Sequence, residues 1–379
     1  MRITGDWIGE KSLGQVMACL NTGGHRAYLV GGCVRNALLG WPVADIDIAT
    51  DARPDEVAER AARAGLKVVP TGIEHGTVTI VAGGIPHEVT TFRRDVETDG
   101  RRAVVAYSDR IEEDAARRDF TMNALYADGA GEVIDPLGGL PDLLARRVRF
   151  VGIPDDRIRE DYLRILRFFR FHAVYGDPAS GPDPDGLAAC AAHADGLDLL
   201  SRERIGHEMR KLLAARDPAP ALATMQMTGI LSRLLPGADA RAVAPLVHLE
   251  GDAPPDWLRR LACVGGEEVV NALRLSRPEA RQLDLTRGLL GAANGPAEIA
   301  FRHGADVARD VMLLRAALLE IPLPEGWQAD IQRGAKAVFP VRAADLPDLS
   351  GAALGARLRE MEARWIAADF GLSREQLLA

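Results

Sequence analysis

The sequence lacks the features that would place the protein in a membrane or outside the cell. Its 379 residues contain no run of about 18 apolar residues of the kind that spans a bilayer. The four cysteines, Cys19, Cys33, Cys190 and Cys263, are far apart and form no Cys-x-x-Cys pair. We therefore expect reduced thiols. The segment Met1–Glu10 has no apolar core of the signal-peptide kind. Together these absences predict a cytoplasmic protein.

Aromatic residues are also scarce, and the chain has no net positive charge. Aromatic residues make up 5% of the chain, and the formal net charge is −8. Any binding of nucleic acid must therefore use local basic surfaces, because the overall charge gives no support for it. A chain that is 47% hydrophobic and 26% charged is typical of a globular protein, and its length predicts two or more domains.

Strand patterns are concentrated in the first part of the chain. Ala27–Val30 and Asp45–Ala49 are predicted strands, and Thr77–Ala82 with His87–Phe92 predict a hairpin around a Gly-Gly-Ile-Pro turn. After about residue 151 the chain is rich in Ala, Leu and Arg at helical spacing. The sequence thus predicts an α+β protein with a mixed head and an all-α tail. Between them, the charged segment Arg93–Ile111 predicts a loop.

A glycine turn follows the first predicted strand. Gly31 and Gly32 allow the backbone to approach a phosphate, whose charge the N–H groups of the following helix start can hold. Arg35 adds a charge-assisted donor. A Gly-Gly pair alone is typical of an ordinary tight turn, so the interpretation depends on the residues that follow.

The next predicted strand carries two acids. Asp45 and Asp47 are two residues apart, so on a strand they point to one face, while Ile46 and Ile48 point to a core. Such carboxylates repel one another unless a cation lies between them, and Mg²⁺ is typically bound by one or two carboxylates plus substrate phosphates. Glu88, on the second strand of the hairpin, is a candidate third acid. A solvated pair at a strand edge is the alternative.

A third group of polar residues lies in Glu112–Leu125, which has the pattern of a helix. Arg117 and Arg118 are placed to clamp phosphates, and Asn123 can reach a sugar hydroxyl. The alternative is a solvated helix face.

Asp161 and Arg164 suit the recognition of a nucleotide base. If they share one helix they are neighbours, and one accepts hydrogen bonds while the other donates them. Cytosine and adenine present an amino donor beside a ring-nitrogen acceptor, whereas guanine and uracil present the reverse order. Each unpaired group in a buried site costs ~1–3 kcal/mol. The pair therefore predicts acceptance of CTP and ATP and rejection of GTP and UTP. The alternative is an amphipathic helix whose arginines, Arg167 and Arg170 included, are solvated.

Together these motifs resemble the class II tRNA nucleotidyltransferases, the bacterial family of CCA-adding enzymes and poly(A) polymerases. They occur in the expected order over roughly residues 28–210. The matching segments are Leu29-Val30-Gly31-Gly32-x-Val34-Arg35, Asp45-x-Asp47-Ile48-Ala49-Thr50, Gly76-Thr77-Val78, Glu88-Val89-Thr90-Thr91-Phe92-Arg93, Arg117-Arg118-Asp119-Phe120-Thr121-x-Asn123-Ala124, Asp135-Pro136-x-Gly138-Gly139, Glu160-Asp161-x-Leu163-Arg164-x-x-Arg167 and Glu203-Arg204-Ile205.

The resemblance implies a polymerase-β-like nucleotidyltransferase head (residues 1–135), a helical neck that recognises the base (136–215), and an all-α body and tail that bind tRNA (216–379). It implies that Asp45 and Asp47 hold Mg²⁺, with Glu88 as a further catalytic acid. The residues with an expected role in nucleotide binding are Gly32, Arg35, Arg117, Arg118, Asn123, Asp161, Arg164, Arg167 and Arg170. The expected activity is the transfer of CMP and AMP from CTP and ATP to the tRNA 3′ end, with release of pyrophosphate.

The chain departs from the family pattern at one site residue. Asn36 stands where the family usually has Asp after Arg35, so any salt bridge that the Asp would make is absent.

Several other functions also stay open. The head motifs barely separate full CCA addition from poly(A), CC-only or A-only addition. A dinucleotide-binding oxidoreductase lacks its Gly-x-Gly-x-x-Gly motif here, and the intact acids and arginines disfavour a non-enzymatic RNA-binding protein.

Overall fold

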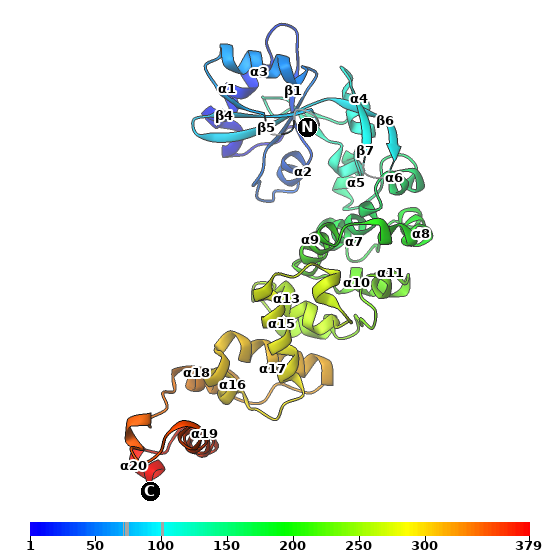
Figure 1. Cartoon of the computed structure of the whole chain (residues 1–379). Coiled ribbons are helices and arrows are strands. Elements are labelled where there is room, and N and C mark those ends of the chain that lie inside the picture. The colour runs from blue at the N-terminus through cyan, green and yellow to red at the C-terminus, as the bar shows by residue number, and fades with distance from the viewer. Residues whose placement is uncertain (71, 73–75, 100–101) are drawn as a thin grey trace. The chain divides into compact units, whose positions relative to one another are not determined.

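The computed structural model describes residues 1–70, 72, 76–99 and 102–379. The chain folds into two compact units, Met1–Leu234 and Leu235–Ala379. The first contains a sheet followed by helices, and the second consists of helices and their connections (Figure 1). This arrangement confirms the predicted α+β class with an all-α tail. Among the described residues, no helix is both long and apolar enough to cross a membrane.

A seven-stranded sheet forms the centre of the head, with the strand order β3-β4-β5-β2-β1-β8-β9. Its strands are β1 (Ala27–Val30), β2 (Asp47–Thr50), β3 (Lys67–Val69), β4 (Thr77–Ala82), β5 (Ile85–Thr91), β8 (Tyr126–Ala127) and β9 (Val133–Ile134). The central strands β1 and β2 bury Leu29 and Ile48, as expected for strands that are covered on both faces. Ile46, also expected in the core, precedes β2 and is only partly buried.

Helices cover both faces of this sheet. In Figure 1, α1 (Lys11–Leu20) and α3 (Pro54–Arg63) lie on one side and α2 (Gly32–Leu38) lies on the other. The start of α3 follows local rules: Pro54 occupies the first helical position, and Glu56 accepts the Arg53 N–H at 2.8 Å. The acids and the glycine turn are therefore held by a packed scaffold.

The segment predicted as a loop contains a β-hairpin. β6 (Arg93–Asp99) and β7 (Arg102–Tyr107) pair antiparallel as a separate two-stranded sheet. Their register shifts between Asp95 and Glu97, which interrupts the two-residue period by which a strand is predicted. The predicted loop also included residues 100 and 101, which lie outside the described residues.

The predicted helix Glu112–Leu125 is much shorter in the structure. α4 (Ile111–Ala116) ends before the arginine pair, and a 3₁₀ turn follows at Thr121–Asn123. Between them the chain turns, and Phe120 is extended and forms a bridge with Phe150, far along the sequence. The prediction that Arg117 and Arg118 lie early in a helix is therefore wrong: they lie at its carboxyl end.

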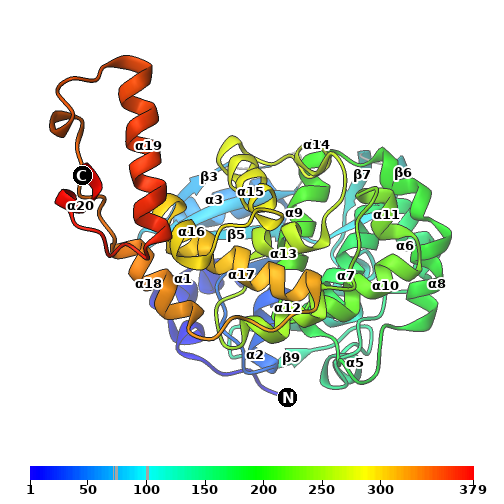
Figure 2. The ribbon, with the colours of Figure 1, turned by 90° about the horizontal axis from the view of Figure 1, so that it is seen from below.

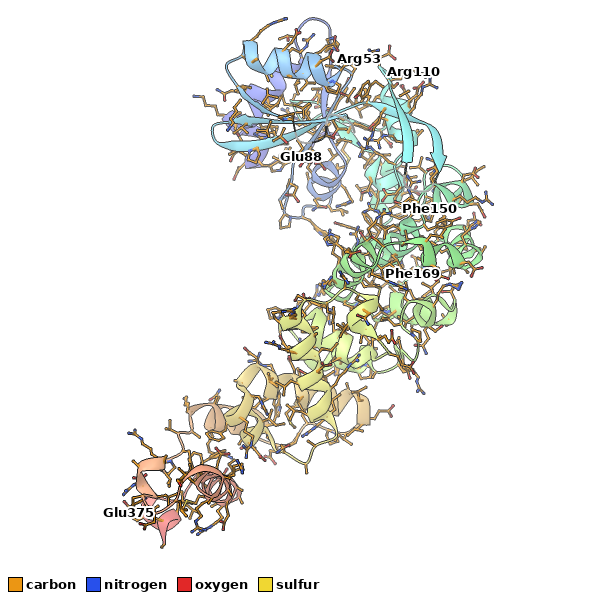
Figure 3. All side chains as sticks on the ribbon, viewed as in Figure 1. Arg53, Glu88, Arg110, Phe150, Phe169 and Glu375 are labelled. Atoms are coloured by element: carbon orange, nitrogen blue, oxygen red, sulfur yellow. The ribbon has the colours of Figure 1, made fainter. Side chains whose placement is uncertain are left out.

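Helices follow the sheet in the first unit. They are α5 (Leu140–Leu144), α6 (Pro154–Glu160), α7 (Leu163–Tyr175), α8 (Pro184–Ala192), α9 (Arg202–Leu213), α10 (Ala219–Met227) and α11 (Ile230–Leu234). Aromatic rings fill their core: Phe150 stacks on Phe168 at 5.5 Å, and Phe120 contacts Phe171 at 4.9 Å between ring centroids. Phe150 and Phe169 can be located in Figure 3. This cluster joins the end of the head to α7.

The second unit consists of helices α12 to α20. They are α12 (Val243–Glu250), α13 (Trp257–Val264), α14 (Val269–Ala272), α15 (Arg277–Leu290), α16 (Pro296–His303), α17 (Ala305–Leu319), α18 (Trp327–Lys336), α19 (Gly351–Ala367) and α20 (Arg374–Leu378). Figure 2 shows α12, α13 and α17 side by side. Near the end of the chain, Trp365 and Met361 are buried in a small core of their own.

Candidate active site

The candidate acids meet where three strands lie next to one another. β2 pairs antiparallel with β1 and parallel with β5, which places Asp47 opposite Val30 on one side and Glu88 on the other. The Gly31 turn begins directly after Val30. Figure 3 labels Glu88 on β5. The sheet register thus brings the predicted third acid and the glycine turn to Asp47.

A pocket of about 670 Å³ opens at this point, and Asp45, Asp47 and Glu88 all line it. Burial and the Glu88 charge raise the pKa of Asp47, Arg118 opposes them, and the Asp45 charge raises it further. The three carboxylates therefore repel one another across the pocket, as expected where a cation would be favourable. β2 runs from Asp47 to Thr50, so the predicted strand Asp45–Ala49 begins two residues too early and ends one residue too early.

Within the described ranges, no group of three or more His, Cys, Asp or Glu side chains could by itself hold a metal ion. A magnesium site does not require such a group, since Mg²⁺ is commonly bound by one or two carboxylates together with substrate phosphates. The donor set fits this kind of cation: Asp45 and Asp47 offer only oxygen ligands and share one open pocket.

The glycine turn lies against Arg118. Gly31 has a φ of 72°, in the left-handed region that glycine adopts without strain. A Cβ built on Gly31 would lie 3.3 Å from Nη1 of Arg118. The backbone turn and the guanidinium therefore face the same space beside Asp47, which suits an anion such as a phosphate.

Asp114 holds both arginines of the Arg117-Arg118 pair. Its carboxylate accepts from Arg117 Nε at 2.8 Å and from Arg118 Nη2 at 3.0 Å, and the Tyr126 hydroxyl donates to it at 2.7 Å. Burial would raise the pKa of Asp114, but the Arg118 and Arg117 charges and the Tyr126 hydroxyl hold it below its usual range. Asp114 was not among the predicted residues, although its spacing of three and four residues from the arginines is that of helical neighbours.

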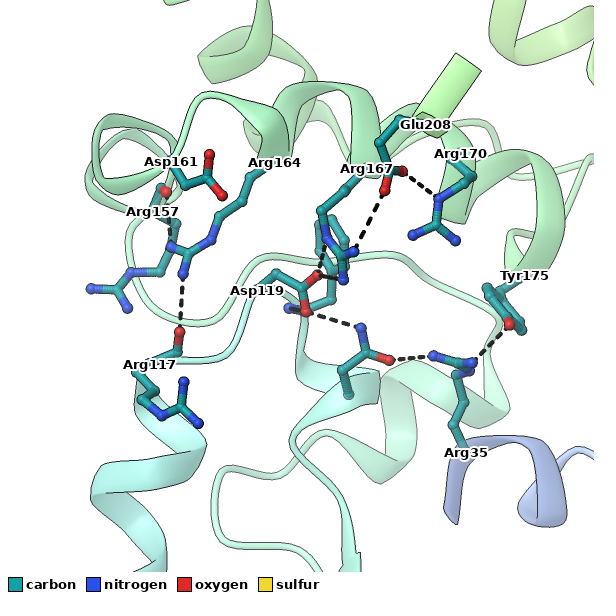
Figure 4. A network of polar contacts seen from close by, with 12 residues as sticks. Arg35, Arg117, Asp119, Arg157, Asp161, Arg164, Arg167, Arg170, Tyr175 and Glu208 are labelled. Atoms are coloured by element: carbon teal, nitrogen blue, oxygen red, sulfur yellow. Dashed lines mark hydrogen bonds and ion pairs between the residues drawn. The ribbon is translucent and has the colours of Figure 1, made fainter. Parts of the chain in front are cut away.

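Arg35 is buried and held by several partners, as Figure 4 shows. It donates through Nη1 to Asn123 and through Nη2 to the Tyr175 hydroxyl at 2.7 Å. Nε and Nη2 also donate to Asn36 at 3.2 and 3.0 Å. Asn36 therefore supplies hydrogen bonds where the family's Asp would add a charge.

Asn123 connects Arg35 to the helix that carries the remaining arginines. Its amide donates to Asp119 at 2.9 Å, and Asp119 accepts from Arg167 Nε at 2.8 Å (Figure 4). Burial would raise the pKa of Asp119, but the Arg167 charge and these hydrogen bonds lower it. Asn123, which was predicted to reach a sugar hydroxyl, binds Arg35 and Asp119 through its amide group in this structure.

Arg167 and Arg170 share a buried carboxylate. Nε of Arg170 donates to Glu208 on α9, and Nη1 of Arg167 lies 3.7 Å from the same carboxylate. Sequence reasoning missed Glu208 and Asp119 as partners, although Asp119 lies within a recognised motif. Nothing local in the sequence relates Glu208 to α7, because the contact depends on how two helices pack.

The structure corrects the expected geometry of Asp161 and Arg164. They do not share a helix, because α6 ends at Glu160 and α7 begins at Leu163. Asp161 lies in the break, where its carboxylate accepts from Arg204 at 2.7 Å. Arg164 turns instead toward the carbonyl groups of residues 157 and 117 (Figure 4). It also donates to the carboxylate of Glu160.

Comparison with known proteins supports one family for the whole chain. Residues 27–149 match the family model of the poly A polymerase head domain, and residues 182–241 match that of the probable RNA and SrmB-binding site of polymerase A. The CCA-adding enzyme of Geobacillus thermodenitrificans is 37% identical over 320 residues, covering 84% of this chain and 72% of that protein. The mouse mitochondrial CCA tRNA nucleotidyltransferase 1 is 30% identical, covering 98% and 89%.

The fold is similar as well. The crystal structure of the Bacillus stearothermophilus CCA-adding enzyme in complex with CTP superposes with a TM-score of 0.71 at 28% identity, covering 95% of this chain and 93% of that one. The ordered motifs, the site geometry and these matches agree, and the chain belongs to the family of CCA-adding tRNA nucleotidyltransferases.

Proposed function

We propose that this protein adds CMP and AMP, taken from CTP and ATP, to the 3′ end of tRNA and releases pyrophosphate. The observation that carries the proposal is the pocket lined by Asp45, Asp47 and Glu88, with the Gly31 turn and the Arg118 charge beside Asp47. The names of the similar proteins, CCA-adding enzyme and CCA tRNA nucleotidyltransferase, support the substrates.

Asp45 and Asp47 are the residues that would hold Mg²⁺, with Glu88 beside them. A bound magnesium ion supplies Lewis-acid chemistry: it lowers the pKa of a bound hydroxyl and stabilises charge on a phosphate. The family in general depends on a divalent metal, and the carboxylate oxygens fit the hard cation Mg²⁺.

The chain's own residues bind and orient the nucleotide. Gly32 begins α2, so its backbone allows close approach of the triphosphate, and Arg118 offers charge-assisted donors beside Asp47. Asp114 holds Arg118 and Arg117 so that their guanidiniums need little reordering when a phosphate binds. Arg35, Arg167 and Arg170, which are held by protein partners, act mainly by fixing the positions of α2 and α7.

The base is proposed to be read by Asp161 and Arg164. Of the five N–H groups of Arg164, three donate within the described residues, which leaves donors for a base. The carboxylate of Asp161 keeps acceptor capacity besides its bonds to Arg204 and to the Leu163 N–H. An acceptor beside a donor matches the pairing edges of cytosine and adenine and opposes those of guanine and uracil.

We further assign a role to each of three parts of the chain and a cellular location to the protein. Residues 1–135 form the catalytic head, 136–215 the neck that reads the base, and 216–379 a body and tail that bind tRNA. A cytoplasmic location is supported by the four cysteines, all of which are buried and free.

The test is incorporation of labelled CMP and AMP into tRNA that lacks its 3′-terminal CCA, with Mg²⁺ and defined nucleotide mixtures. The wild type should add three nucleotides and stop. Asp45→Ala should lose incorporation, whereas Glu59→Ala, an exposed acid on α3, should not. Full activity of Asp45→Ala would contradict the assignment of the metal ligand. A long product with ATP alone would indicate a poly(A) polymerase, and a product one or two nucleotides long a partial enzyme.

A further inference from the structure

Three arginines surround one aromatic ring, and one of the three lacks a carboxylate partner. The guanidiniums of Arg35, Arg167 and Arg170 lie 5.2, 5.2 and 4.5 Å from the ring centroid of Phe171. Arg167 and Arg170 are paired with Asp119 and Glu208, respectively. Among the described residues, no carboxylate forms an ion pair with Arg35, whose hydrogen-bond partners are the neutral groups of Asn36, Asn123 and Tyr175.

The charged form of Arg35 is destabilised because its guanidinium is buried without an ion-pair partner in the described part of the chain. Arg35 is 7% exposed. Burial lowers its pKa, with weaker opposing influences from Tyr175 and from the charge of Asp119, which forms no ion pair with it. A buried charge is normally paired with an opposite charge. Position 36 is the best placed to carry a negative charge next to Arg35. The residue there is the neutral Asn36, whose Oδ1 accepts from Nε and Nη2 of Arg35. Asn36 therefore supplies hydrogen bonds to Arg35 without a negative charge.

Aromatic rings occupy the space on the other side of Arg35. Its guanidinium lies 4.0 Å from the ring centroid of Tyr175, closer than to any other ring described. Trp41, in the segment after α2, stacks on Tyr175 with centroids 5.2 Å apart and planes 26° from parallel. Arg146 closes the stack, because it lies 5.9 Å from the Trp41 ring and its Nε donates to the Tyr175 carbonyl at 3.1 Å.

We propose that Tyr175, backed by Trp41, is a positioning residue that holds Arg35 by a cation–π contact in place of the missing carboxylate. A cation over an aromatic face is stabilised by the ring quadrupole, most strongly where water is excluded. The inference rests on the proposed function, because Arg35 lies three residues after the start of α2 and contacts Asn123, which leads through Asp119 to Arg167. The aromatic stack therefore fixes the triphosphate side of the site relative to α7, which carries Arg164.

The test is a comparison of four proteins: the wild type, Tyr175→Leu, Asn36→Asp and the double variant. Calorimetry measures the Kd for CTP, and CMP addition to tRNA measures KM and kcat. Tyr175→Leu should raise the Kd and KM for CTP about thirtyfold, since a desolvated cation–π contact is worth ~2 kcal/mol. Asn36→Asp in the same protein should restore both to within about threefold of the wild type, because a carboxylate replaces the ring as the partner of the charge.

Two controls separate positioning from packing. Tyr175→Phe keeps the ring and loses only the hydroxyl acceptor, so it should bind CTP nearly as well as the wild type. Tyr28→Leu removes another stacked ring of the head, and Asn36→Asp should not rescue it. If Tyr175→Leu binds CTP normally, or if the double variant binds no better than Tyr175→Leu, the proposal is overturned.

Failure of the proposed function would have a different signature. A wild type that binds CTP but transfers nothing to tRNA contradicts the function, while the binding comparison still decides the role of Tyr175. Thermal unfolding of the four proteins tests the role of Tyr175 without any nucleotide. Tyr175→Leu should lower the Tm, and the double variant should regain part of that loss. Additive changes in Tm, with no coupling between positions 36 and 175, count against the proposal.

Discussion

At the scale of single residues, Asp114 links the stability of the head to the phosphate site. Its side chain is 1% exposed and accepts from Arg117, Arg118 and Tyr126. Removing the charge of a buried group that holds two cations leaves both cations undercompensated. Asp114 therefore combines a structural role with the task of presenting Arg118 to the phosphate site.

We expect Asp114→Asn to lower the free energy of unfolding at pH 7 on the order of 3 kcal/mol and to reduce nucleotide transfer strongly. The pKa of Asp114 is lowered in the folded protein. Its stabilising contribution is therefore fully present above the unfolded value, about 3.9, and is lost as the pH falls through the lower folded-state pKa. Urea unfolding at a series of pH values should show the difference between wild type and variant shrinking below about pH 4.

Glu112 on the same helix provides the control for this pH series. Its side chain is exposed and lies 3.7 Å from Arg110. Glu112→Gln should therefore change stability by less than about 1 kcal/mol at pH 7. A constant difference between wild type and Asp114→Asn across the whole pH range would contradict the linkage argument.

At the scale of elements, the β6–β7 hairpin is the candidate for the switch from CTP to ATP. It leads directly into α4, and Arg94 of β6 lies 3.8 Å from Glu113 of α4. α4 ends immediately before Arg117 and Arg118, so a movement of the hairpin would be passed to the phosphate site. Its two-stranded structure makes the hairpin more rigid than the loop predicted for this segment.

Replacing residues 93–107 with a Gly/Ser linker should spare the addition of the two C residues and impair the addition of A. The physical reason is that a flexible linker could not transmit a movement to α4, whereas the pocket acids and the glycine turn would stay in place. Sequencing gels of tRNA products with CTP alone and with CTP plus ATP measure the two steps. A linker of the same kind at residues 178–182 is the control. Equal loss of C and A addition would count against the switch.

Sequence patterns predicted the elements whose signals are local. The apolar strand Ala27–Val30, the Gly31 turn and the hairpin β4–β5 follow from neighbouring residues, and the structure confirms them. The prediction failed where distant contacts decide the conformation: Phe120 is extended because it pairs with Phe150. For the same reason the pattern of Asp161 could not reveal a helix break stabilised by Arg204, 43 residues later.

At the scale of the whole molecule, the second unit contains a buried network of ion pairs of its own. It shares no residue with the candidate active site of the first unit. Arg259 donates to Glu250 and Asp310, both at 2.8 Å, and Arg260 donates to Glu250 at 2.7 Å. All four side chains are buried. These contacts tie together α12, α13 and α17, which Figure 2 shows side by side. The two units thus depend on different interactions for stability.

Glu250→Gln should destabilise the second unit by about 3–5 kcal/mol, because it removes the carboxylate shared by two buried arginines. Hydrogen exchange measured by mass spectrometry should show faster exchange in α12, α13 and α17, with α7 unchanged. Glu360→Gln, which removes an exposed pairing with Arg357 on α19, is the matched control and should leave exchange as in the wild type. The same variant tests the division of labour: its Kd for CTP should be unchanged, while its KM for tRNA should rise because the proposed tRNA-binding unit is loosened. Faster exchange in α7 and in the second unit to the same degree would instead mean that the two compact units unfold as one.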